Sequence, residues 1–426
     1  MITLQKQLGV YMFALLSMQL SAQQKQEVTL VQLQTMAKEY YPLLSQKQIY
    51  TDISNNKVKQ LSSNFLPQVS LTGQATYQSE VTELNIPIPG VESGGFKQKP
   101  DQYAIGLEVK ENIFDYGVVK AQKQIERESA DLQTKQVDTE LIKLKERINM
   151  LYGNIFLQQE NKKILLLRTA ELDAKRSKMK SAVSNGAALQ SNFLVLESEY
   201  LSTEQKIEEI NSNLIVWFKT LSILTNKTFD TTTVFVDVKK ETVLQSTIIR
   251  PEFKVFELQS TTLQLREKMI GRNNLPKVFV FGRGYYGRPG YNFLNNAFRP
   301  YGMIGAGLNW NISAYYTSGK EAKNLKLNND IVTSQKRIFE LNLQATMIQQ
   351  QEEIAKLEKM LVMDAKIVET KTSIRKSSSS QLDNGIITSS DFIVDLNSEN
   401  QSQFNLKLHE IQLMMAKENY NTTLGY

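Results

Sequence analysis

Three segments of the chain alternate apolar and polar residues with a period of two, as half-buried β-strands do. In the segment 69–77, Val69 and Leu71 share one side with Gly73, and Ser70 and Thr72 lie on the other. The segments 103–110 and 304–312 show the same alternation. A strand of about ten residues fits a tilted membrane-barrel strand, and it also fits a soluble antiparallel sheet with one buried face. The period alone leaves both alternatives open.

Two much longer segments have a helical pattern. From Val118 to Val183 there is no proline and the only internal glycine is Gly153, and the segment 320–382 contains neither residue. The first segment has roughly 65 residues, which corresponds to about 100 Å of α-helix at ~1.5 Å per residue. It contains a heptad seam of apolar residues that step by four and three: Val137, Leu141, Leu144, Ile148, Leu151 and Ile155. Such rods must pack against one another or against partners.

Each long helix is predicted to end at an Asn-Gly pair and to be followed at once by another helix. Asn185-Gly186 and Asn384-Gly385 can supply the left-handed residue that closes a helix. Ser191 and Asp391 lie where a polar N-cap or a first-turn acid would begin the next helix. The sequence therefore predicts two helical hairpins, each with an exposed turn at its tip.

These elements belong to an internal repeat. The segment from Leu66-Pro67 to Tyr77 aligns with the one from Leu275-Pro276 to Tyr286, 209 positions later. Further along, from Ile105 to Phe193, the matching residues lie 199 positions later. The change in offset predicts a loop that is ten residues longer in the first copy, between Tyr77 and Tyr103.

The repeat predicts the domain organisation. The first copy covers 23–240, with a strand pair over 67–114 and a helical hairpin over 118–225. The second copy covers 241–426, with a strand pair over 276–313 and a helical hairpin over 320–424. In both copies a helix precedes the strands.

The N-terminus has the features of a secretory signal peptide over residues 1–22. Lys6 precedes the apolar stretch Leu8–Leu20, and Ser21-Ala22 offers a small-residue cleavage site. No later stretch has 18 uncharged apolar residues, so the sequence predicts no transmembrane helix. An exported chain of this kind is periplasmic, secreted or an outer-membrane β protein.

Composition argues against several classes of function. There is no cysteine and one histidine, His409, which lies in a helical run. Thiol catalysis and Cys-ligated metals are thereby excluded, and we predict neither an enzyme nor a metal or cofactor site. The net charge of +6 is not gathered into a basic block, so we predict no nucleic-acid partner. Gly282 to Gly287 matches G-x-G-x-x-G, but Arg288-Pro289-Gly290 follows where a nucleotide site needs a helix.

The order of these motifs resembles the TolC family of outer-membrane efflux and secretion channels. The matching segments are Val28–Leu33 before Tyr41-Pro42, Arg250-Pro251-Glu252, both Leu-Pro strand starts, Ile113–Gly117 at the strand-to-helix junction, and Asn384–Thr388. The resemblance implies an α+β membrane protein. Its strands, four per chain, would form a trimeric transmembrane β-barrel, continued by a long periplasmic α-helical barrel of coiled-coil hairpins.

The resemblance also implies the function and the partners. The chain would be one subunit of a homotrimeric channel in the cell outer membrane, in contact with its lipid and extending into the periplasm. It would serve a tripartite efflux pump or a type I secretion system as a passive exit duct. A periplasmic adaptor protein would connect it to an inner-membrane transporter that supplies the energy.

Individual residues are implied by their positions in the hairpins. Adaptor docking would fall on the turns, and the periplasmic gate on acids just after the second turn. The docking residues are Asn185, Gly186, Asn384, Gly385 and Ile386, and the gate residues are Asp391, Asp395 and, in the first copy, Asn192. Asp391 can equally be a plain helix-start acid, and the chain lacks the lipidated N-terminal cysteine of several family members.

A different class of protein also accounts for the long helices. A periplasmic coiled-coil adaptor or structural protein without a barrel would contain a helical hairpin, although adaptors normally have one hairpin and no duplicated strand pairs. A soluble periplasmic monomer would favour that alternative.

Overall fold

The computed structural model describes residues 27–84, 95–236 and 243–426. The predicted signal peptide and the loop that begins at Ile86 lie outside these residues. The chain divides into two compact units, each described below by itself. The sheet unit contains Ser45–Val137 and Glu252–Phe339, and the helical unit contains Met1–Leu44, Asp138–Pro251 and Glu340–Tyr426.

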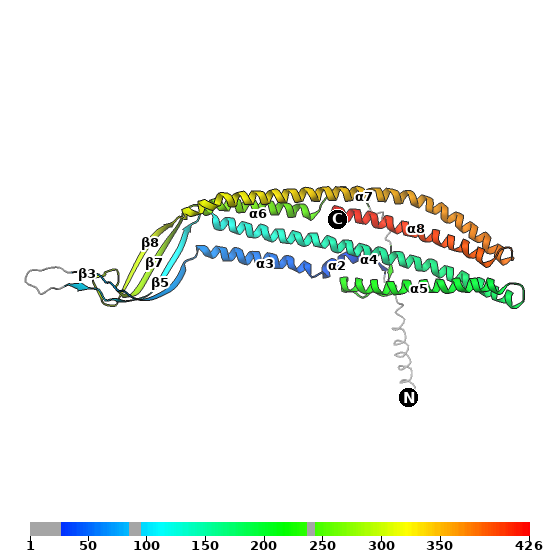
Figure 1. Cartoon of the computed structure of the whole chain (residues 1–426), viewed down its shortest axis with the longest axis horizontal. Helices are drawn as coiled ribbons and strands as arrows, with labels where there is room; N and C mark the ends of the chain where they lie inside the picture. The colour runs from blue at the N-terminus through cyan, green and yellow to red at the C-terminus, as the bar shows by residue number, and fades with distance from the viewer. Residues whose placement is uncertain (1–26, 85–94, 237–242) are drawn as a thin grey trace, which may run out of the picture. The chain divides into compact units, whose positions relative to one another are not determined.

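The sheet unit contains a four-stranded antiparallel sheet in the order β2-β5-β7-β8. Its strands are β2 (Gln68–Tyr77), β5 (Asp101–Phe114), β7 (Lys277–Arg288) and β8 (Arg299–Asn309). β5, β7 and β8 run side by side in Figure 1. The central pair β5–β7 joins the two copies that the sequence suggests. The short strands β3 (Glu83–Leu84) and β4 (Phe96–Lys97) pair beyond β2.

The two faces of this sheet differ in chemistry. Cross-strand register places Leu71 opposite Leu107, and Gly282 opposite both Val109 and Ile304, on one apolar face. Ile304 is 90% exposed and Leu71 is 69% exposed. Polar and aromatic side chains occupy the opposite face, as the period-two pattern predicts. Among the described residues of the single chain, therefore, nothing covers this face rich in Val, Leu and Ile.

Two glycines allow neighbouring strands to approach. A Cβ on Gly287 would lie 2.2 Å from the carbonyl oxygen of Tyr103, and one on Gly106 would lie 2.2 Å from that of Gly284. Gly287, the last glycine of the G-x-G-x-x-G match, is thus required by strand packing. Gly284 of the same match meets nothing within 4 Å.

The helices of the sheet unit differ at their ends. α3 (Leu43–Ser62) is followed by the 3₁₀ turn η1 (Ser63–Phe65), and α6 (Pro251–Asn273) begins at a proline. α4 (Val118–Ser184) begins after Tyr116 and Gly117, with φ of 56° and 77°. The Asp115 carboxylate accepts hydrogen bonds from the backbone amides of Gly117 (2.8 Å) and Val119 (2.7 Å). These bonds satisfy two amides at the helix start.

The second copy makes this junction differently. Strand β8 ends at Asn309, although the alternation predicts a strand to residue 312. Ile312–Ala314 form the 3₁₀ turn η2, and α7 (Tyr315–Asp383) follows at once. The sequence here has Ala314, Tyr315 and Tyr316 in place of the Asp-Tyr-Gly of the first copy. Without the aspartate and the glycine, the chain cannot repeat the capped left-handed turn before α4.

The helical unit contains α2 (Leu30–Tyr40), α5 (Gln190–Thr225), α8 (Ser389–Leu424) and the later parts of α4 and α7. The predicted seam is confirmed, because all six of its residues from Val137 to Ile155 are buried. The strands β1 (Glu27–Val28) and β6 (Val234–Phe235) pair in parallel nearby, where Phe235 stacks on Phe218 at 5.8 Å. Within the described residues, no helix has the length and apolar character needed to cross a membrane.

Candidate functional site: the hairpin turns and the polar network behind them

The turn between α4 and α5 is closed by Gly186, as predicted. Gly186 has a φ of 74°, and its amide donates to the carbonyl oxygen of Val183 at 3.0 Å. The amide of Ala187 donates to the carbonyl of Ala182 at 2.8 Å. Together these bonds satisfy carbonyls at the end of α4. Asn185 precedes the glycine and is exposed.

The turn between α7 and α8 repeats this geometry. Gly385 has a φ of 71°, and the amide of Ile386 donates to Gln381 at 2.8 Å. The Asn384 side chain donates to the carbonyl of Ser380 at 2.9 Å. Ile386 is 70% exposed, and Leu189 after the first turn is 72% exposed. Ile386 follows Gly385 directly, and Leu189 lies three residues after Gly186. Each turn thus presents an exposed apolar side chain close to its glycine.

The starts of the following helices differ. Thr388 caps α8, and Asp391 is the first-turn acid that the sequence predicts. α5 instead begins after Leu189, which makes no side-chain cap, and Ser191 already lies inside that helix. The predicted cap at Ser191 is therefore wrong, because helix geometry begins one residue before it.

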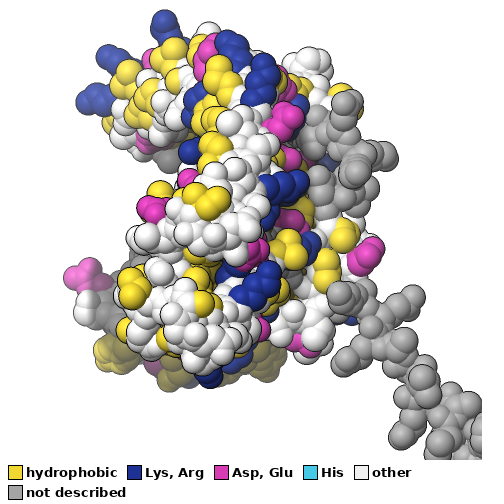
Figure 2. Space-filling model, turned by 90° about the vertical axis from the view of Figure 1, so that its right-hand side faces the viewer, with side chains coloured by type: hydrophobic (Ala, Val, Ile, Leu, Met, Phe, Trp, Pro, Cys, Tyr) yellow, Lys and Arg dark blue, Asp and Glu magenta, His cyan; other side chains and the backbone are white. Residues whose placement is uncertain are grey.

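The two hairpins pack against each other behind the turns. Their shared core is formed by residues of all four helices: Leu172, Leu196, Leu382, Phe392, Ile393 and Leu396. Phe392 and Leu196 are fully buried. Figure 1 shows the α4–α5 and α7–α8 turns at the same end of the helical unit. Figure 2 looks at the face that contains these turns and shows hydrophobic side chains interspersed with Lys and Arg.

The three residues predicted for a gate have different surroundings. Asp391 is exposed, and its carboxylate accepts bonds from the hydroxyl (2.6 Å) and amide (3.0 Å) of Thr388. These hydrogen bonds lower the pKa of Asp391. Asp395 accepts a hydrogen bond from Ser378 of α7. Asn192 accepts one from the Ser389 amide at 3.4 Å, which links α5 to the start of α8.

A set of buried or half-buried charges joins the hairpins further from the turns. Arg375 of α7 contacts Glu399 of α8 at 2.7 Å and Glu171 of α4 at 3.1 Å. Its hydrogen bond with Glu399, supported by the nearby charge of Glu171, raises the pKa of Arg375. Glu399 is 3% exposed, so its carboxylate depends on this guanidinium for compensation.

A second arginine joins three other helices. Arg168 of α4 donates to Glu199 of α5 and Asn397 of α8, and its side chain is 5% exposed. Burial lowers the pKa of Arg168, although Glu199 opposes this shift. Its Nε atom has no hydrogen-bond partner among the described residues. Arg168 and Glu199 line a cavity of about 580 Å³ whose other walls combine amide and apolar side chains of α4, α5 and α8.

A lysine fixes the end of α7. Lys175 of α4 contacts the Asp383 carboxylate at 2.8 Å and donates to the carbonyl of Ser379 at 3.1 Å. Lys178 adds a weaker contact with Asp383 at 3.5 Å. The hydrogen bond from Lys175 and the charges of both lysines lower the pKa of Asp383. The last turn of α7 is thereby tied to α4.

Sequence reasoning missed Arg168, Lys175, Arg375 and their partners. A signal for the first two exists, because Leu165, Arg168, Leu172 and Lys175 step by three, four and three, and all four are buried. Charged residues at core spacing indicate a polar contact inside a helix interface. No local pattern in the sequence identifies the carboxylates that pair with these cations.

The only histidine is part of a helix pair. His409 of α8 lies 2.6 Å from the Asp364 carboxylate of α7, measured from Nδ1 to Oδ2. His409 thus lies in a helix, as its sequence context predicts. No cluster of three or more His, Asp or Glu residues that could hold a metal ion occurs in 27–84, 95–236 or 243–426.

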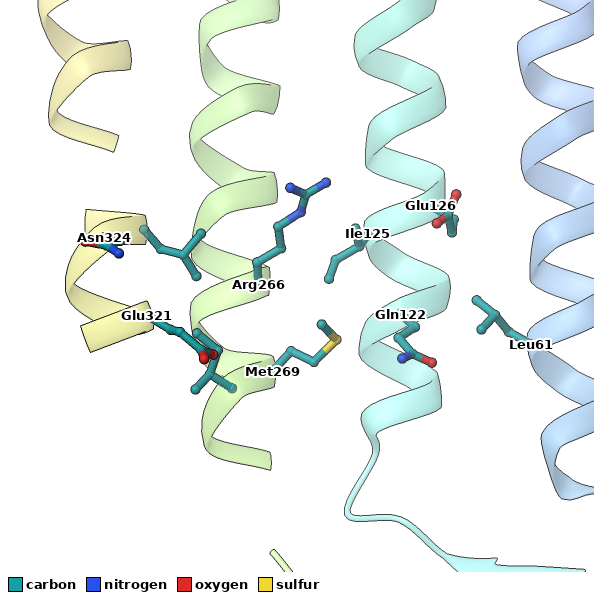
Figure 3. A pocket seen from close by; sticks show the side chains of 10 residues that line it. Leu61, Gln122, Ile125, Glu126, Arg266, Met269, Glu321 and Asn324 are labelled. Atoms are coloured by element: carbon teal, nitrogen blue, oxygen red, sulfur yellow. The ribbon is translucent and has the colours of Figure 1, made fainter. Parts of the chain in front are cut away.

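The sheet unit has a cavity of its own, of about 570 Å³, between its four helices. Figure 3 shows Ile125 of α4 and Met269 of α6 in the gap between these two helices, and Leu61 of α3 on the other side of α4. Arg266 and Glu321 also line the cavity. Its lining is mainly apolar, as expected of a gap between packed helices.

Comparisons with known proteins agree with this architecture. Residues 33–226 match the family model of the outer membrane efflux proteins. No curated protein matches the chain. Among solved structures, CusC has a TM-score of 0.74 at 11% identity, over 93% of this chain and 92% of its own.

Two further structures show the same similarity. The outer-membrane channel OprN has a TM-score of 0.69 at 12% identity, over 93% of this chain and 89% of its own. The Neisseria gonorrhoeae MtrE outer membrane channel, in its open state, has a TM-score of 0.67 at 13% identity, over 93% and 88%. At such identities the structures establish the fold, while the family model carries the relationship. Residues 33–226 thus match the outer membrane efflux proteins in sequence, and the chain resembles the TolC-like outer-membrane channels in fold.

Proposed function

We propose that the chain is one subunit of a homotrimeric outer-membrane channel that gives substrates a passive exit duct. The observation that carries this proposal is the sheet β2-β5-β7-β8, with one exposed apolar face and two open edges at β2 and β8. Unpaired backbone groups at a sheet edge cannot persist in lipid, so such a sheet must close. Four strands are too few to close alone, and three copies would give the twelve-stranded barrel of the family.

The helices would continue the duct into the periplasm. α4 and α7 have 67 and 69 residues, about 100 Å of helix each at ~1.5 Å per residue. Many of their large apolar side chains, such as Leu167 (75% exposed) and Met363 (65% exposed), have no cover within the single chain. Exposed apolar positions along such rods are expected where neighbouring subunits pack.

The hairpin turns would dock a periplasmic adaptor that connects the channel to an inner-membrane transporter. The exposed Ile386 beside Gly385, and the equivalent turn at Asn185, Gly186 and Ala187, offer apolar contacts and close backbone approach. Asn384 orders the second turn through its own side chain. A tripartite efflux pump and a type I secretion system both use such a docking surface.

The periplasmic end would be narrowed near Asp391, Asp395 and Asn192. Asp395 and Asn192 make contacts between helices behind the turns, and Asp391 keeps its charge to lower pH than an ordinary aspartate. Three subunits would place three copies of Asp391 around one opening. Mutual repulsion and hydration of these carboxylates would govern small ions there.

The test is to express the full chain with its own N-terminus and fractionate the cell envelope. We expect the protein in the outer membrane, as a trimer that dissociates on heating and forms ion-conducting channels in planar bilayers. A soluble periplasmic monomer without conductance would contradict the proposal and favour a coiled-coil adaptor.

A further inference from the structure

The face of the sheet opposite the apolar one has an excess of positive charge. Register places Arg283 opposite Glu108, Lys110 opposite Phe281, Lys277 opposite Asn309, and Arg299 opposite Gly287 on this face. Of these strand residues four are cationic and only Glu108 is anionic. We call this set, with the aromatic rings between its members, the cationic wall.

One of the cations is compensated and another is available to a ligand. Arg283 forms a forked contact with Glu108, at 3.0 Å from Nε and 2.8 Å from the terminal nitrogen. The Nζ atom of Lys110 lies 4.1 Å from the ring centroid of Phe279, and no ion pair joins it to a carboxylate within the described strands. A lysine over an aromatic ring keeps its charge and can still donate to an anion.

Aromatic rings fill the space between these charges, and they lie against glycines of the neighbouring strands. A Cβ on Gly307 would come within 2.5 Å of the Phe279 ring, and one on Gly305 within 2.8 Å of the Phe281 ring. A Cβ on Gly106 would come within 2.4 Å of the Tyr285 ring. Each ring thus covers the backbone of a partner strand, while Lys110 lies over the Phe279 ring, Arg283 lies over the Phe281 ring and Tyr285 stacks on Tyr301. The Phe279 and Phe281 side chains are half-buried and so partly accessible to a solute.

We propose that the cationic wall is a binding surface for anionic aromatic solutes, and that it makes the barrel favour anions over cations. This inference rests on the proposed function, in which the apolar face meets lipid and the cationic wall therefore lines the lumen. The accessible parts of the Phe279 and Phe281 rings would contact an aromatic solute, while Lys110 would contact its acidic group.

The strength of the effect follows from screening. Lumenal charges act over about 10 Å at an ionic strength of 0.1 M and over about 3 Å at 1 M. Lys110, Lys277 and Arg299, for which no ion pair occurs among the described residues, would therefore raise the local anion concentration mainly at low salt. Aromatic contacts are not screened, so aromatic anions would be retained more strongly than chloride at every ionic strength.

The first experiment measures the chloride-to-potassium permeability ratio of reconstituted trimers in a KCl gradient near 0.1 M. The variant K110Q/K277Q removes two charges that have no carboxylate partner among the described residues. We expect the ratio to fall by about threefold, and the difference to disappear near 1 M salt. The matched control is Arg288→Gln, on the same strand but on the apolar face, where Arg288 pairs with Asp101 and lies 5.5 Å from the Tyr103 ring.

The second experiment adds naphthalene-2-sulfonate to the side that contains the β-strand loops. We expect a partial block of the current that weakens in K110Q/K277Q and in F279L/F281L, since leucine keeps bulk but not the ring face. Channels that conduct normally but show an unchanged permeability ratio and an unchanged block would overturn this inference and leave the proposed function standing. Trimers that do not conduct at all would instead overturn the proposed function and this inference with it.

Discussion

The guanidinium group of Arg375 lies 3.1 Å from the carboxylate of Glu171 and so joins α7 of one hairpin to α4 of the other. Arg176 lies 199 positions before Arg375, at the equivalent place in the first copy, and its contacts differ. Arg176 pairs with Asp173 and Glu197, both within the α4–α5 hairpin, and stacks over Tyr200. Of these two equivalent arginines, therefore, Arg375 contacts both hairpins and Arg176 contacts residues of its own hairpin.

The variant Glu171→Gln should loosen the hairpins without unfolding them. Arg375 keeps its bond to Glu399, so the buried charge is not left alone, and the loss amounts to about 0.5–1 kcal/mol for a partly exposed pair. If the hairpins narrow the periplasmic end, single-channel conductance should rise.

Glu197→Gln is the matched control. It also removes one carboxylate charge, but from the partner of Arg176, which lies in the same hairpin as Glu197. Its conductance should stay at the wild-type value. Equal conductance in both variants and in the wild type would show that the link between the hairpins does not restrict the channel.

The repeating parts of the fold could be predicted from the sequence, because they depend on local patterns. The alternation in β2 and β5, the heptad seam before Ile155 and the left-handed Gly186 and Gly385 each follow from residues close together in the chain. The end of β8 at Asn309 could not be predicted, because the apolar alternation continues to Ile312 while the backbone turns away.

The polar network behind the turns depends on contacts that a single sequence does not specify. Arg375 meets Glu171 across 204 positions, and Asn192 meets the Ser389 amide across 197. Which charges face each other is set by the rotation of each helix about its axis. That rotation depends on the joint packing of Leu172, Phe392 and their neighbours, not on any local motif.

Asp391→Asn tests the gate directly and copies the first repeat, which has Asn192 at the equivalent position. Asparagine can also serve at a helix start, so α8 should keep its boundaries. Loss of three carboxylates around the periplasmic opening should raise single-channel conductance in planar bilayers. An unchanged conductance in intact trimers would leave Asp391 with its capping role alone.

Gly385→Val should abolish efflux while trimers still form. A β-branched residue at a φ of 71° costs about 1–2 kcal/mol and would change the path of the exposed turn beside Ile386. Gly319→Ala, inside α7 before this turn, is the control, because a Cβ there meets nothing within 4 Å and alanine favours helix. Wild-type efflux in cells with Gly385→Val would exclude the turn as the docking surface.

Gly106→Ala should weaken the sheet, whereas Gly284→Ala should not. The added methyl at position 106 would lie 2.2 Å from the carbonyl oxygen of Gly284 and 2.4 Å from the Tyr285 ring, but at position 284 it meets nothing within 4 Å. Overpacking of this kind costs about 1–3 kcal/mol. The temperature at which the trimer dissociates in gel electrophoresis should fall for the first variant alone, and equal temperatures would contradict the β5–β7 register.

Acid should loosen the turns only below the ordinary range of aspartate. Lys175 lowers the pKa of Asp383, and Thr388 lowers that of Asp391, so both groups bind protons less readily in the folded state. Their contribution to stability is therefore complete above the unfolded pKa of about 3.9, and it is lost as the pH falls through the lower folded values.

Because the chain has no cysteine, a spin label at Ile386→Cys can report on the second turn alone. We expect the label's mobility to stay constant from neutral pH to about pH 4 and to increase below it. The variant Asp383→Asn replaces the carboxylate that pairs with Lys175 by a neutral amide. In this variant the mobility of the label should already be higher at neutral pH. A wild-type transition near pH 6 would contradict this assignment and require another titrating group.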